Sequence, residues 1–405
     1  MYKKTEDIIV VGAGLTGLAF CNLLKNTNIR LSLLDIHPKK FYKSFENDRH
    51  IVLSNSSKSI FESIGLWEEI NKYCSKVKNI HISKKSIFGS TVVRSADENL
   101  ESLGYQVPVK ILIQILYSNI ENENNVNFIH EAKVIDVEKG KEIIINYQHN
   151  SIEKSLTSNS LIFSSGSTDT LIEDLFPKKI QKNFRQDAIV FELLSNKYNA
   201  DTAYERFTNK GVLGLIPRKE NVWTLIYSTD KNESEFIRKL KGVEIKKYFQ
   251  NLMGEKCGEI LEINNIKVYP LKMQYYKNFT NNNICLLGDA AHTLHPIAAQ
   301  SFNLSLRDCT HLTEMIKKIE KENISDFSVI FHNYYQERID EVNRLVKFTD
   351  YLASFIHGKG FLKNNIVSAS LLFMDMNKSL RINIIRYLLG VNFSQTLISN
   401  LENQQ

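Results

Sequence analysis

Long apolar runs and paired cysteines are both missing from this sequence of 405 residues. No stretch approaches the roughly 18 apolar residues that a membrane-spanning helix requires. The opening letters "MYKKTED" lead directly into an apolar strand, so we expect no signal peptide. The 5 cysteines form no Cys-x-x-Cys pair and lie mostly among apolar residues. This pattern favours reduced, buried thiols in a cytoplasmic protein.

A concentrated basic surface is missing as well. The formal net charge is +6, but the basic residues are dispersed along the chain, and lysine greatly outnumbers arginine. We therefore expect no nucleic-acid partner. Hydrophobic residues make up 43% and charged residues 24% of the chain, which is ordinary for a globular protein. The length predicts two domains or one large interleaved unit.

The first motif is "VVGAGLTGLAF", which has the spacing Gly-x-Gly-x-x-Gly and stands between a predicted strand and a predicted helix. Gly12 is expected to make the tight turn. Gly14, after Ala13, would let the backbone approach a diphosphate, and Gly17 would let the helix lie close to the sheet. Asp35 closes the next strand, where an acid can accept hydrogen bonds from a ribose. The motif predicts a dinucleotide site, but alone it does not separate NAD from FAD.

The pattern of apolar and polar residues changes twice in the rest of the chain. Between about 180 and 275, short strand-like runs such as "DAIVFELL" and "VWTLIYS" alternate with turn residues and predict a mostly antiparallel sheet. A long amphipathic helix is predicted from about residue 300, and the chain reads as helical from about 327 to its end. This order predicts an α/β nucleotide-binding domain, a β-sheet insertion, a return to the first domain and a helical tail.

The segment "LLGDAAHTLHPIAAQSFNLSLRD" begins as a strand, turns at Gly288 and Asp289, and then enters the long helix. A turn that brings backbone close to a ligand usually needs glycine. No glycine occurs between Gly288 and Gly358. The sequence therefore raises the question whether this is a ligand-binding turn or only a connection between a strand and a helix.

Three histidines lie near these motifs. His292 and His295 have the spacing His-x-x-His, which could suggest a metal, but no third ligand is visible. We therefore expect no metal site. For these two and for His50, a structural role is favoured over a role in proton transfer.

Six stretches occur in one fixed order: "GAGLTG", "DRHIVLS…IGLW", "LGYQVPVKILIQIL", "AYERFT", "YPL" and "LLGDAAHTLHPIAAQSFNLSLRD". In this order the chain resembles the single-component FAD-dependent aromatic hydroxylases, and within them the ubiquinone-biosynthesis branch. The resemblance covers nearly the whole chain. It implies a Rossmann-type FAD-binding domain, an interleaved and mostly antiparallel β-sheet substrate domain, and a C-terminal helical region. The implied ranges are 1–70, 101–180 and 275–345 for FAD binding, 71–100 and 181–274 for substrate, and 346–405 for the helical region.

The resemblance also implies roles for single residues. Arg49 would lie near the flavin diphosphate and ring, Gln114 would contact FAD, and Asp289 would accept hydrogen bonds from the ribityl hydroxyls. Pro296 and 297–301 would pass along the isoalloxazine edge, and the following helix would present N–H groups to the ring. The full expected cofactor-binding set is Gly12, Ala13, Gly14, Gly17, Asp35, Arg49, Gln114, Gly288, Asp289, Pro296, Ala299, Gln300, Ser301 and Asn303. No catalytic acid–base pair is predicted.

The activity that the resemblance implies is hydroxylation of the aromatic ring of a polyprenylated phenol in ubiquinone biosynthesis. NAD(P)H would reduce FAD, oxygen would give a flavin hydroperoxide, and the ring would attack its terminal oxygen. The phenol and other ubiquinone-biosynthesis proteins would be the partners. The basic and apolar residues after 355 fit either helices packed on the core or a basic face on the inner membrane surface. We expect a cytoplasmic protein, with helices packed on the core as the favoured interpretation and peripheral membrane contact as the alternative.

Two departures from the family pattern bear on this activity. The family usually has an Asp where this chain has Ser165, so a carboxylate linked to FAD and nicotinamide binding is missing unless Asp169 replaces it. The branch usually has glycine where this chain has Ala299, Ser301 and Ser305. A left-handed φ at these positions would cost roughly 1 kcal/mol, and we favour helical φ instead. The departures motivate the alternative of a catalytically weakened scaffold subunit, and a flavin oxidase or dehydrogenase is the third alternative.

Overall fold

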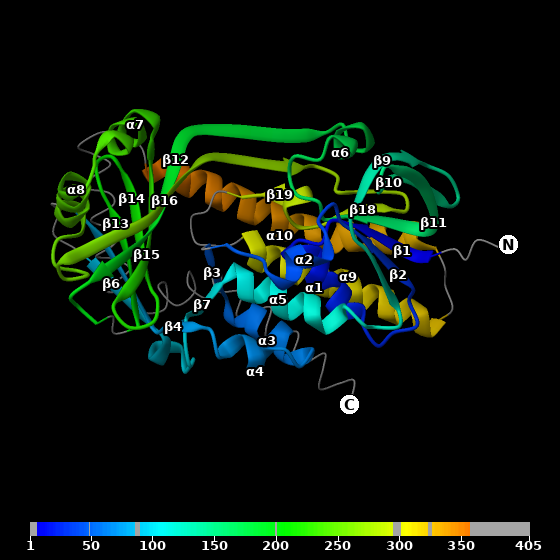
Figure 1. Cartoon of the computed structure of the whole chain (residues 1–405), viewed down its shortest axis with the longest axis horizontal. Helices are drawn as coiled ribbons and strands as arrows, with labels where there is room; N and C mark the ends of the chain where they lie inside the picture. Colours follow the sequence, from blue (N-terminus) through cyan, green and yellow to red (C-terminus); the bar gives the residue numbers. More distant parts are fainter. Residues whose placement is uncertain are drawn as a thin grey trace.

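The computed structural model describes residues 6–47, 49–85, 90–198, 201–294, 301–322 and 326–356. Two eight-stranded sheets form the two halves of the molecule (Figure 1). A small three-stranded sheet lies with the connecting segments between them. This small sheet consists of β3 (His50–Leu53), β7 (Gly104–Pro108) and β4 (Ser75–Val77).

The first sheet has the strand order β17-β18-β11-β1-β2-β8, with β10 and β9 continuing from β11. The pairs β18–β11, β11–β1, β1–β2 and β2–β8 are all parallel. Because both faces of these strands are covered, the last four residues of β1 and all of β2 are buried, and they are apolar except for Ser32. The bounds are β1 (Glu6–Val11), β2 (Leu31–Leu34), β8 (Val126–Ile129), β9 (Ala132–Glu138), β10 (Ile143–His149), β11 (Ile152–Phe163), β17 (Thr280–Asn281) and β18 (Ile284–Leu286).

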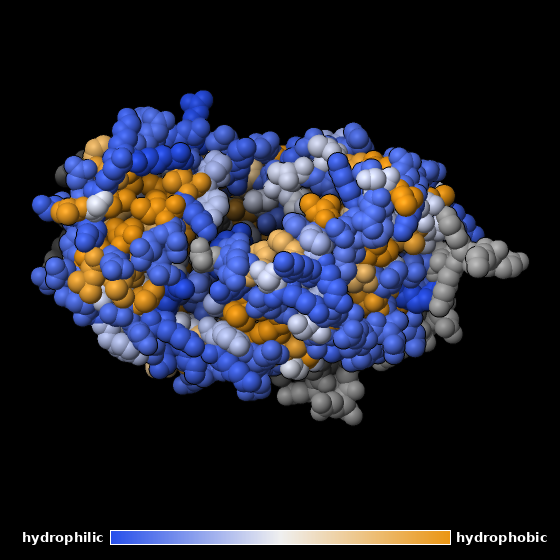
Figure 2. Space-filling model, viewed as in Figure 1, coloured by the Kyte–Doolittle hydropathy of each residue, from blue (hydrophilic) through white to orange (hydrophobic). Residues whose placement is uncertain are grey.

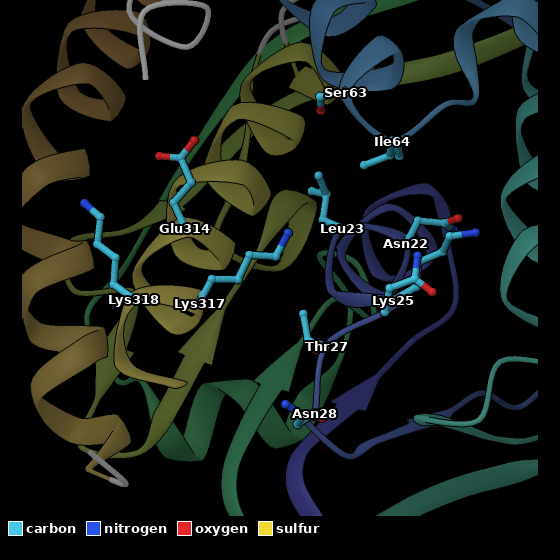
Figure 3. Close-up of a pocket in the computed structure, with 11 residues that line it drawn as sticks. Asn22, Leu23, Lys25, Thr27, Asn28, Ser63, Ile64, Glu314, Lys317 and Lys318 are labelled. Atoms are coloured by element: carbon cyan, nitrogen blue, oxygen red, sulfur yellow. The ribbon is translucent and has the colours of Figure 1, made fainter. Parts of the chain in front are cut away.

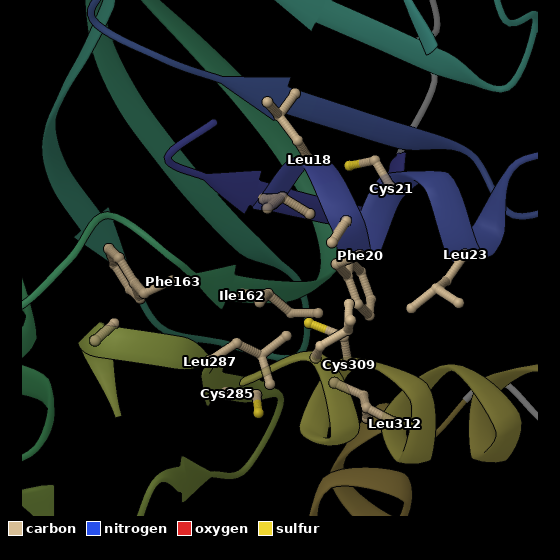
Figure 4. Packing of buried hydrophobic residues seen from close by; sticks show 14 of the residues in the cluster. Leu18, Phe20, Cys21, Leu23, Ile162, Phe163, Cys285, Leu287, Cys309 and Leu312 are labelled. Carbon is tan, nitrogen blue, oxygen red and sulfur yellow. The ribbon is translucent and has the colours of Figure 1, made fainter. Parts of the chain in front are cut away.

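Helices cover this sheet, and the main core lies between them and the strands. α1 packs against both α5 and α9. Three of the five free cysteines, Cys21, Cys285 and Cys309, are buried in this core among leucines and Phe20 (Figure 4). The helices of this half are α1 (Leu15–Leu24), α2 (Lys39–Lys43), α3 (Asn55–Ser63), α4 (Trp67–Asn71), α5 (Val109–Ile120), α6 (Thr170–Leu175), α9 (Ser301–Glu322) and α10 (Phe327–Ile356).

The second sheet has the order β19-β16-β12-β15-β14-β13-β5-β6 and is antiparallel except where β13 pairs with β5. Helices α7 (Lys231–Lys239) and α8 (Val243–Met253) cover its outer face. β12 and β16, of 17 residues each, run from this sheet towards the first half (Figure 1). The bounds are β5 (Asn79–Lys84), β6 (Ser90–Arg94), β12 (Lys179–Ser195), β13 (Thr202–Phe207), β14 (Gly211–Pro217), β15 (Val222–Asp230), β16 (Ile260–Tyr276) and β19 (His292–Thr293).

The predicted fold class is confirmed. In the stretch that ends with "IGLW", α3 stops at Ser63 and Trp67 begins the separate helix α4. Gly65 has φ +72, and the Leu66 N–H donates to the Phe61 carbonyl, which is the usual way for a glycine to end a helix.

The carboxy-terminal part is described as far as residue 356. The expected division between the FAD-binding domain and the helical region, at 345 and 346, falls within the single helix α10. That division stays a prediction. The expected helical run beyond 356 lies outside the described residues. Within the described residues, we find no helix that combines the length and apolarity needed to cross a bilayer.

Candidate functional site

The glycine motif forms the turn between β1 and α1. Gly12 has φ +99, and its N–H donates to the Leu34 carbonyl over 2.8 Å. A Cβ at Gly12 would lie 2.6 Å from the Ser165 Cα atom, so no other residue fits there without a shift of backbone. Because β1 pairs in parallel with both β2 and β11, the carboxyl ends of all three strands lie at one edge of the sheet, where this turn is found.

The other two glycines of the motif differ from each other in what surrounds them. A Cβ at Gly17 would lie 2.0 Å from the Gly12 carbonyl oxygen, which explains how closely α1 lies on the sheet. A Cβ at Gly14 would meet nothing within 4 Å. The N-terminus of α1 has no side-chain cap and no acid in its first turn. Backbone N–H groups therefore face open space at a helix N-terminus, which is suited to a diphosphate.

Asp35 lies directly after β2 and connects that strand to the turn. Its Oδ2 atom accepts a hydrogen bond from the Ala13 N–H over 2.7 Å. Its Oδ1 atom accepts from the His37 N–H over 2.9 Å and lies 2.7 Å from the His37 Nδ1 atom. The His37 ring is stacked on Phe41 with the ring centres 3.8 Å apart. His37 was not predicted from the sequence, although its position two residues after the acid allows a local contact.

The Gly288–Asp289 turn meets the start of α1. Gly288 has φ +63, and a Cβ there would lie 2.4 Å from the Thr16 Oγ1 atom. The Asp289 side chain is exposed. Burial raises the pKa of Asp289, while the charges of His292 and Arg49 lower it. Arg49, 240 residues away in the sequence, is therefore close enough to act on this carboxylate.

A buried charged network lies behind this turn. The Asp308 carboxylate on α9 lies 2.7 Å from the His292 Nε2 atom and accepts from Arg338 Nε on α10, also over 2.7 Å. Arg338 also pairs with Glu341, which accepts from Arg307 Nε over 2.9 Å. The network connects β19, α9 and α10. His292 is engaged by the Asp308 carboxylate. No group of three metal-binding side chains occurs among the described residues.

The glycine turn, Asp35 and the Asp289 turn all lie at one edge of the first sheet. Figure 2 shows a hollow between the two halves of the molecule. The sequence pattern of the FAD binding domain family matches residues 5–349 of this chain. The chain belongs to this family.

Similar proteins extend the match beyond the cofactor half. Ubiquinone hydroxylase UbiM of Neisseria meningitidis is 24% identical, over 78% of this chain and 69% of its own length. Ubiquinone biosynthesis monooxygenase COQ6 of Schizosaccharomyces pombe is 22% identical, over 83% of this chain and 82% of its own length. The crystal structure of p-nitrophenol 4-monooxygenase PnpA from Pseudomonas putida superposes with a TM-score of 0.77 at 13% identity, over 96% and 99% of the two chains. These matches confirm the resemblance to ubiquinone-branch hydroxylases, and they confirm FAD as the cofactor of an FAD-dependent monooxygenase.

The described residues fit FAD at this edge. The open space in front of Gly14 and the uncapped start of α1 suit the diphosphate, and the exposed carboxylate of Asp289 suits sugar hydroxyls. Gln114 lies on α5 with its amide nitrogen 3.5 Å from the Lys43 carbonyl oxygen. The roles of the single residues towards FAD stay predictions.

Asn303 serves to fix the start of α9. Its Oδ1 atom accepts from the Ser54 N–H over 2.9 Å and from the Ser57 hydroxyl over 2.7 Å. Its amide nitrogen donates to the Val52 carbonyl over 2.9 Å. These contacts hold α9 against β3 and α3, and the role of Asn303 towards FAD stays a prediction.

The missing glycines have an ordinary explanation where the structure describes them. Ser301 begins α9, and neither Ser301 nor Ser305 has a positive φ. The Ser305 hydroxyl donates to the Ser301 carbonyl over 2.9 Å, as helical serines do. Helical φ is therefore confirmed at both positions. His295, Pro296, Ala299 and Gln300 lie outside the described residues.

Ser165 stands where the family pattern leads one to expect Asp, and its side chain contacts a nearby carboxylate. The Ser165 hydroxyl donates to the Asp169 Oδ2 atom over 2.5 Å. The other oxygen of Asp169 accepts from the Leu171 N–H and caps α6. The Asp169 carboxylate therefore lies at the end of β11, beside the Gly12 turn.

A separate cavity of about 810 Å³ lies beyond the far end of α1 (Figure 3). Lys25, Glu314 and Lys317 are among the residues that line it. Lys25 donates to the Asn119 Oδ1 atom over 3.0 Å and lies 3.6 Å from the Glu123 carboxylate. None of the predicted FAD-binding residues that the structure describes lines this cavity, so it is distinct from the FAD site.

Proposed function

We propose that this chain hydroxylates the aromatic ring of a polyprenylated phenol in ubiquinone biosynthesis, with NAD(P)H and O₂ as co-substrates. One observation supports this most strongly. The relatives whose names refer to ubiquinone are similar over more than three-quarters of the chain, so the similarity includes the half that does not bind FAD. A shared FAD domain alone would not extend through the second sheet.

The protein's part in the reaction is to bind, orient and exclude water. The Gly12 turn and the start of α1 would hold the diphosphate, Asp35 the adenosine ribose and Asp289 the ribityl chain. FAD, when bound, supplies the chemistry that reduces oxygen and transfers one atom to the ring. The hollow between the two halves is the place where a ring can lie against the cofactor edge (Figure 2).

Reduction by NAD(P)H is part of this proposal. The absence of an Asp at 165 argued against it in the sequence, and the contact between Ser165 and Asp169 supports it. We infer that Asp169 serves the function of the missing carboxylate. The alternative of a scaffold subunit would require that the FAD site be dispensable for the pathway.

The proposed substrate bears on location and partners. A polyprenyl tail partitions into a bilayer, so a cytoplasmic enzyme for such a substrate is expected to contact the inner membrane surface peripherally. Contacts with other ubiquinone-biosynthesis proteins would follow, since each enzyme must pass on a membrane-bound intermediate. The basic and apolar residues on which the membrane prediction depends lie after 356, outside the described residues.

Labelled oxygen tests the reaction class. Purified protein with FAD, NADPH or NADH and a 2-farnesylphenol in detergent is incubated under ¹⁸O₂, and the product is analysed by mass spectrometry. The proposal expects one ¹⁸O atom in a new ring hydroxyl. Oxidation of the nicotinamide with hydrogen peroxide as the only oxygen product, or a dehydrogenated product without label, would reject hydroxylation.

A further inference from the structure

The two faces of the second sheet are used differently. The outer face carries leucines, Trp223 and Tyr227, which are buried under α7 and α8. Tyr204 of β13 lies on this outer face, since its ring lies beside that of Trp223. Arg206 is two residues further along the same strand and therefore shares this face. Side chains alternate along a strand. Glu205, between Tyr204 and Arg206, therefore points to the inner face.

The register places an apolar row across the inner face with Glu205 in it. Glu205 lies opposite Ile82 of β5 and Gly214 of β14, and Gly214 lies opposite Ile226 of β15. All four of these residues are half-buried, whereas the outer-face residues next to Gly214 and Ile226, namely Leu213, Leu215, Leu225 and Tyr227, are buried. The inner face is thus an apolar floor that water reaches, and Glu205 contributes a carboxyl group to it.

The space above this floor is open beside Glu205. A Cβ on Gly214 would meet only the Ile226 carbonyl oxygen, at 3.8 Å. Residues directly opposite each other in a sheet point to the same side. The open space at Gly214 is therefore the space into which Glu205 projects.

This face is also the one turned towards the FAD half. Thr224 of β15 lies two residues before Ile226 and so shares its face. The Gln106 amide nitrogen of β7 donates to the Thr224 hydroxyl over 2.9 Å. β7 belongs to the small sheet between the halves, so the floor that holds Glu205 forms one wall of that space.

The Glu205 carboxyl group has no hydrogen bond or ion pair with any residue that the structure describes. Burial raises its pKa. Among the flanking strands, β14 has no ionisable side chain, and β5 has Lys84 on the same face, one row away beside Phe207. Burial lowers the pKa of Lys84. A half-buried carboxyl group without a partner is costly to keep, so it points to a ligand group that it binds.

We propose that Glu205 binds the ring hydroxyl of the phenol substrate and takes its proton as the ring reacts. The inference depends on the proposed function, because it assumes a phenol in the space above β13 and β14. The phenol O–H bond breaks and a carboxyl O–H bond forms, while the electron pair stays on the phenol oxygen. Nothing is oxidised or reduced in this step. The ring gains electron density and becomes a better nucleophile towards the oxygen atom that FAD chemistry supplies.

Two variants and a control test the proposal. Glu205→Gln keeps the size and loses the proton acceptor, and Gly214→Val fills the open space with a residue suited to a strand. Glu235→Gln, on the exposed side of α7, is the matched control. For each protein, the dissociation constant of 2-farnesylphenol is measured by the change in flavin absorbance, together with FAD uptake, thermal midpoint, and kcat/KM against pH.

Glu205→Gln is expected to weaken phenol binding about tenfold, corresponding to loss of one hydrogen bond to a charged group. It is also expected to remove the acidic limb of the pH profile, while FAD uptake stays unchanged. Gly214→Val is expected to abolish phenol binding and keep the wild-type fold. Wild-type phenol affinity and pH profile in Glu205→Gln would overturn the inference, as would normal binding in a folded Gly214→Val.

The binding measurement separates this inference from the proposed function. If wild-type protein hydroxylates the phenol and Glu205→Gln does so equally at every pH, only the role of Glu205 fails. If wild-type protein binds FAD but neither binds nor hydroxylates the phenol, the proposed function fails and the inference fails with it. If wild-type protein binds the phenol without hydroxylating it, a loss of binding in Glu205→Gln still supports the contact.

Discussion

The Ser165 hydroxyl donates to the Asp169 carboxylate over 2.5 Å, at the end of β11 beside the Gly12 turn. Asp169 also accepts from the Leu171 N–H and so caps α6. One carboxylate therefore has two functions, a structural one at the helix start and a second one at the sheet edge where FAD is expected. The two functions can be separated by the choice of substitution.

Asp169→Asn keeps the cap and removes the charge, because Asn and Asp are about equally good as caps. We expect its thermal midpoint to stay near that of the wild type, and reduction of bound flavin by NAD(P)H to slow about tenfold, as for a lost charged hydrogen bond. Asp169→Ala should lose about 1 kcal/mol of stability in addition. Stopped-flow flavin absorbance and thermal unfolding measure the two effects. Wild-type reduction kinetics in Asp169→Asn would mean that the carboxylate is structural only.

Gly14→Ala and Gly17→Ala are expected to fail in opposite ways. The Cβ at Gly14 would enter open space at an ordinary φ of −71°, so the FAD-free protein should be as stable as the wild type. FAD affinity should fall, because the methyl group occupies the space in front of the helix N-terminus. At Gly17 the Cβ would lie 2.0 Å from a carbonyl oxygen, and overpacking of this kind costs about 1–3 kcal/mol or more. Thermal unfolding without FAD, followed by FAD titration, distinguishes them.

Asp289→Asn should not destabilise the FAD-free protein, but it should weaken the binding of FAD. Burial raises the folded-state pKa of Asp289, so the charged form is disfavoured and stability is lost as pH rises through that pKa. At neutral pH the neutral amide removes this penalty, which is small because the side chain is exposed, so the thermal midpoint of the FAD-free protein should stay at or slightly above that of the wild type. FAD affinity should fall about tenfold or more, because charged acceptors bind hydroxyls more strongly than amides do. A lower midpoint, or unchanged affinity, would contradict this account of the Asp289 turn.

Arg338→Met should destabilise the protein strongly, because it leaves Asp308 buried without its guanidinium partner. Breaking such a pair typically costs about 3–5 kcal/mol. Adding Asp308→Asn should recover part of the loss, since the buried charge is then gone. Urea unfolding of the two single variants and the double variant gives the coupling energy. Additive losses would show that the two side chains act independently.

The Asp308 carboxylate should also make the free energy of unfolding depend on pH. Burial would raise the pKa of Asp308, but the Arg338 guanidinium and the hydrogen bond with His292 lower it to about 2. Since the unfolded pKa is about 3.9, this stabilisation is complete above that value and is lost as pH falls through about 2. The difference in unfolding free energy between wild type and Asp308→Asn should therefore shrink between about pH 4 and pH 2. A constant difference across that range would contradict the ion pair.

Local patterns were sufficient for much of the fold. β1, α1 and β2 follow from an apolar run, a helical face and a glycine turn within 35 residues. The steric contacts of Gly12 and Gly17 bear out what the motif implied. The antiparallel strands between 180 and 275 were equally readable, because turn residues separate them. Elements that depend on the local backbone preferences of one stretch of sequence could therefore be predicted.

Contacts between distant segments could not be predicted. Asn303 is predicted to bind the cofactor, and only the packing of α9 against β3 shows that its side chain also binds Ser54 and Ser57. Even at short range, the contact between Asp169 and Ser165 depends on how the loop closes, and the sequence left that open. Glu205 stood within a recognised motif, but its face of the sheet was known only once the register of β5, β13 and β14 was fixed.

An FAD titration tests the central claim, a flavin site at the Gly12 and Asp289 turns, most directly. The visible absorbance spectrum of the purified protein is recorded before and after adding FAD and removing the excess by gel filtration. The account predicts a yellow protein with one FAD per chain, and a colourless but folded Gly14→Val variant. A folded wild-type protein that stays colourless, or a Gly14→Val variant that retains FAD equally well, would contradict it.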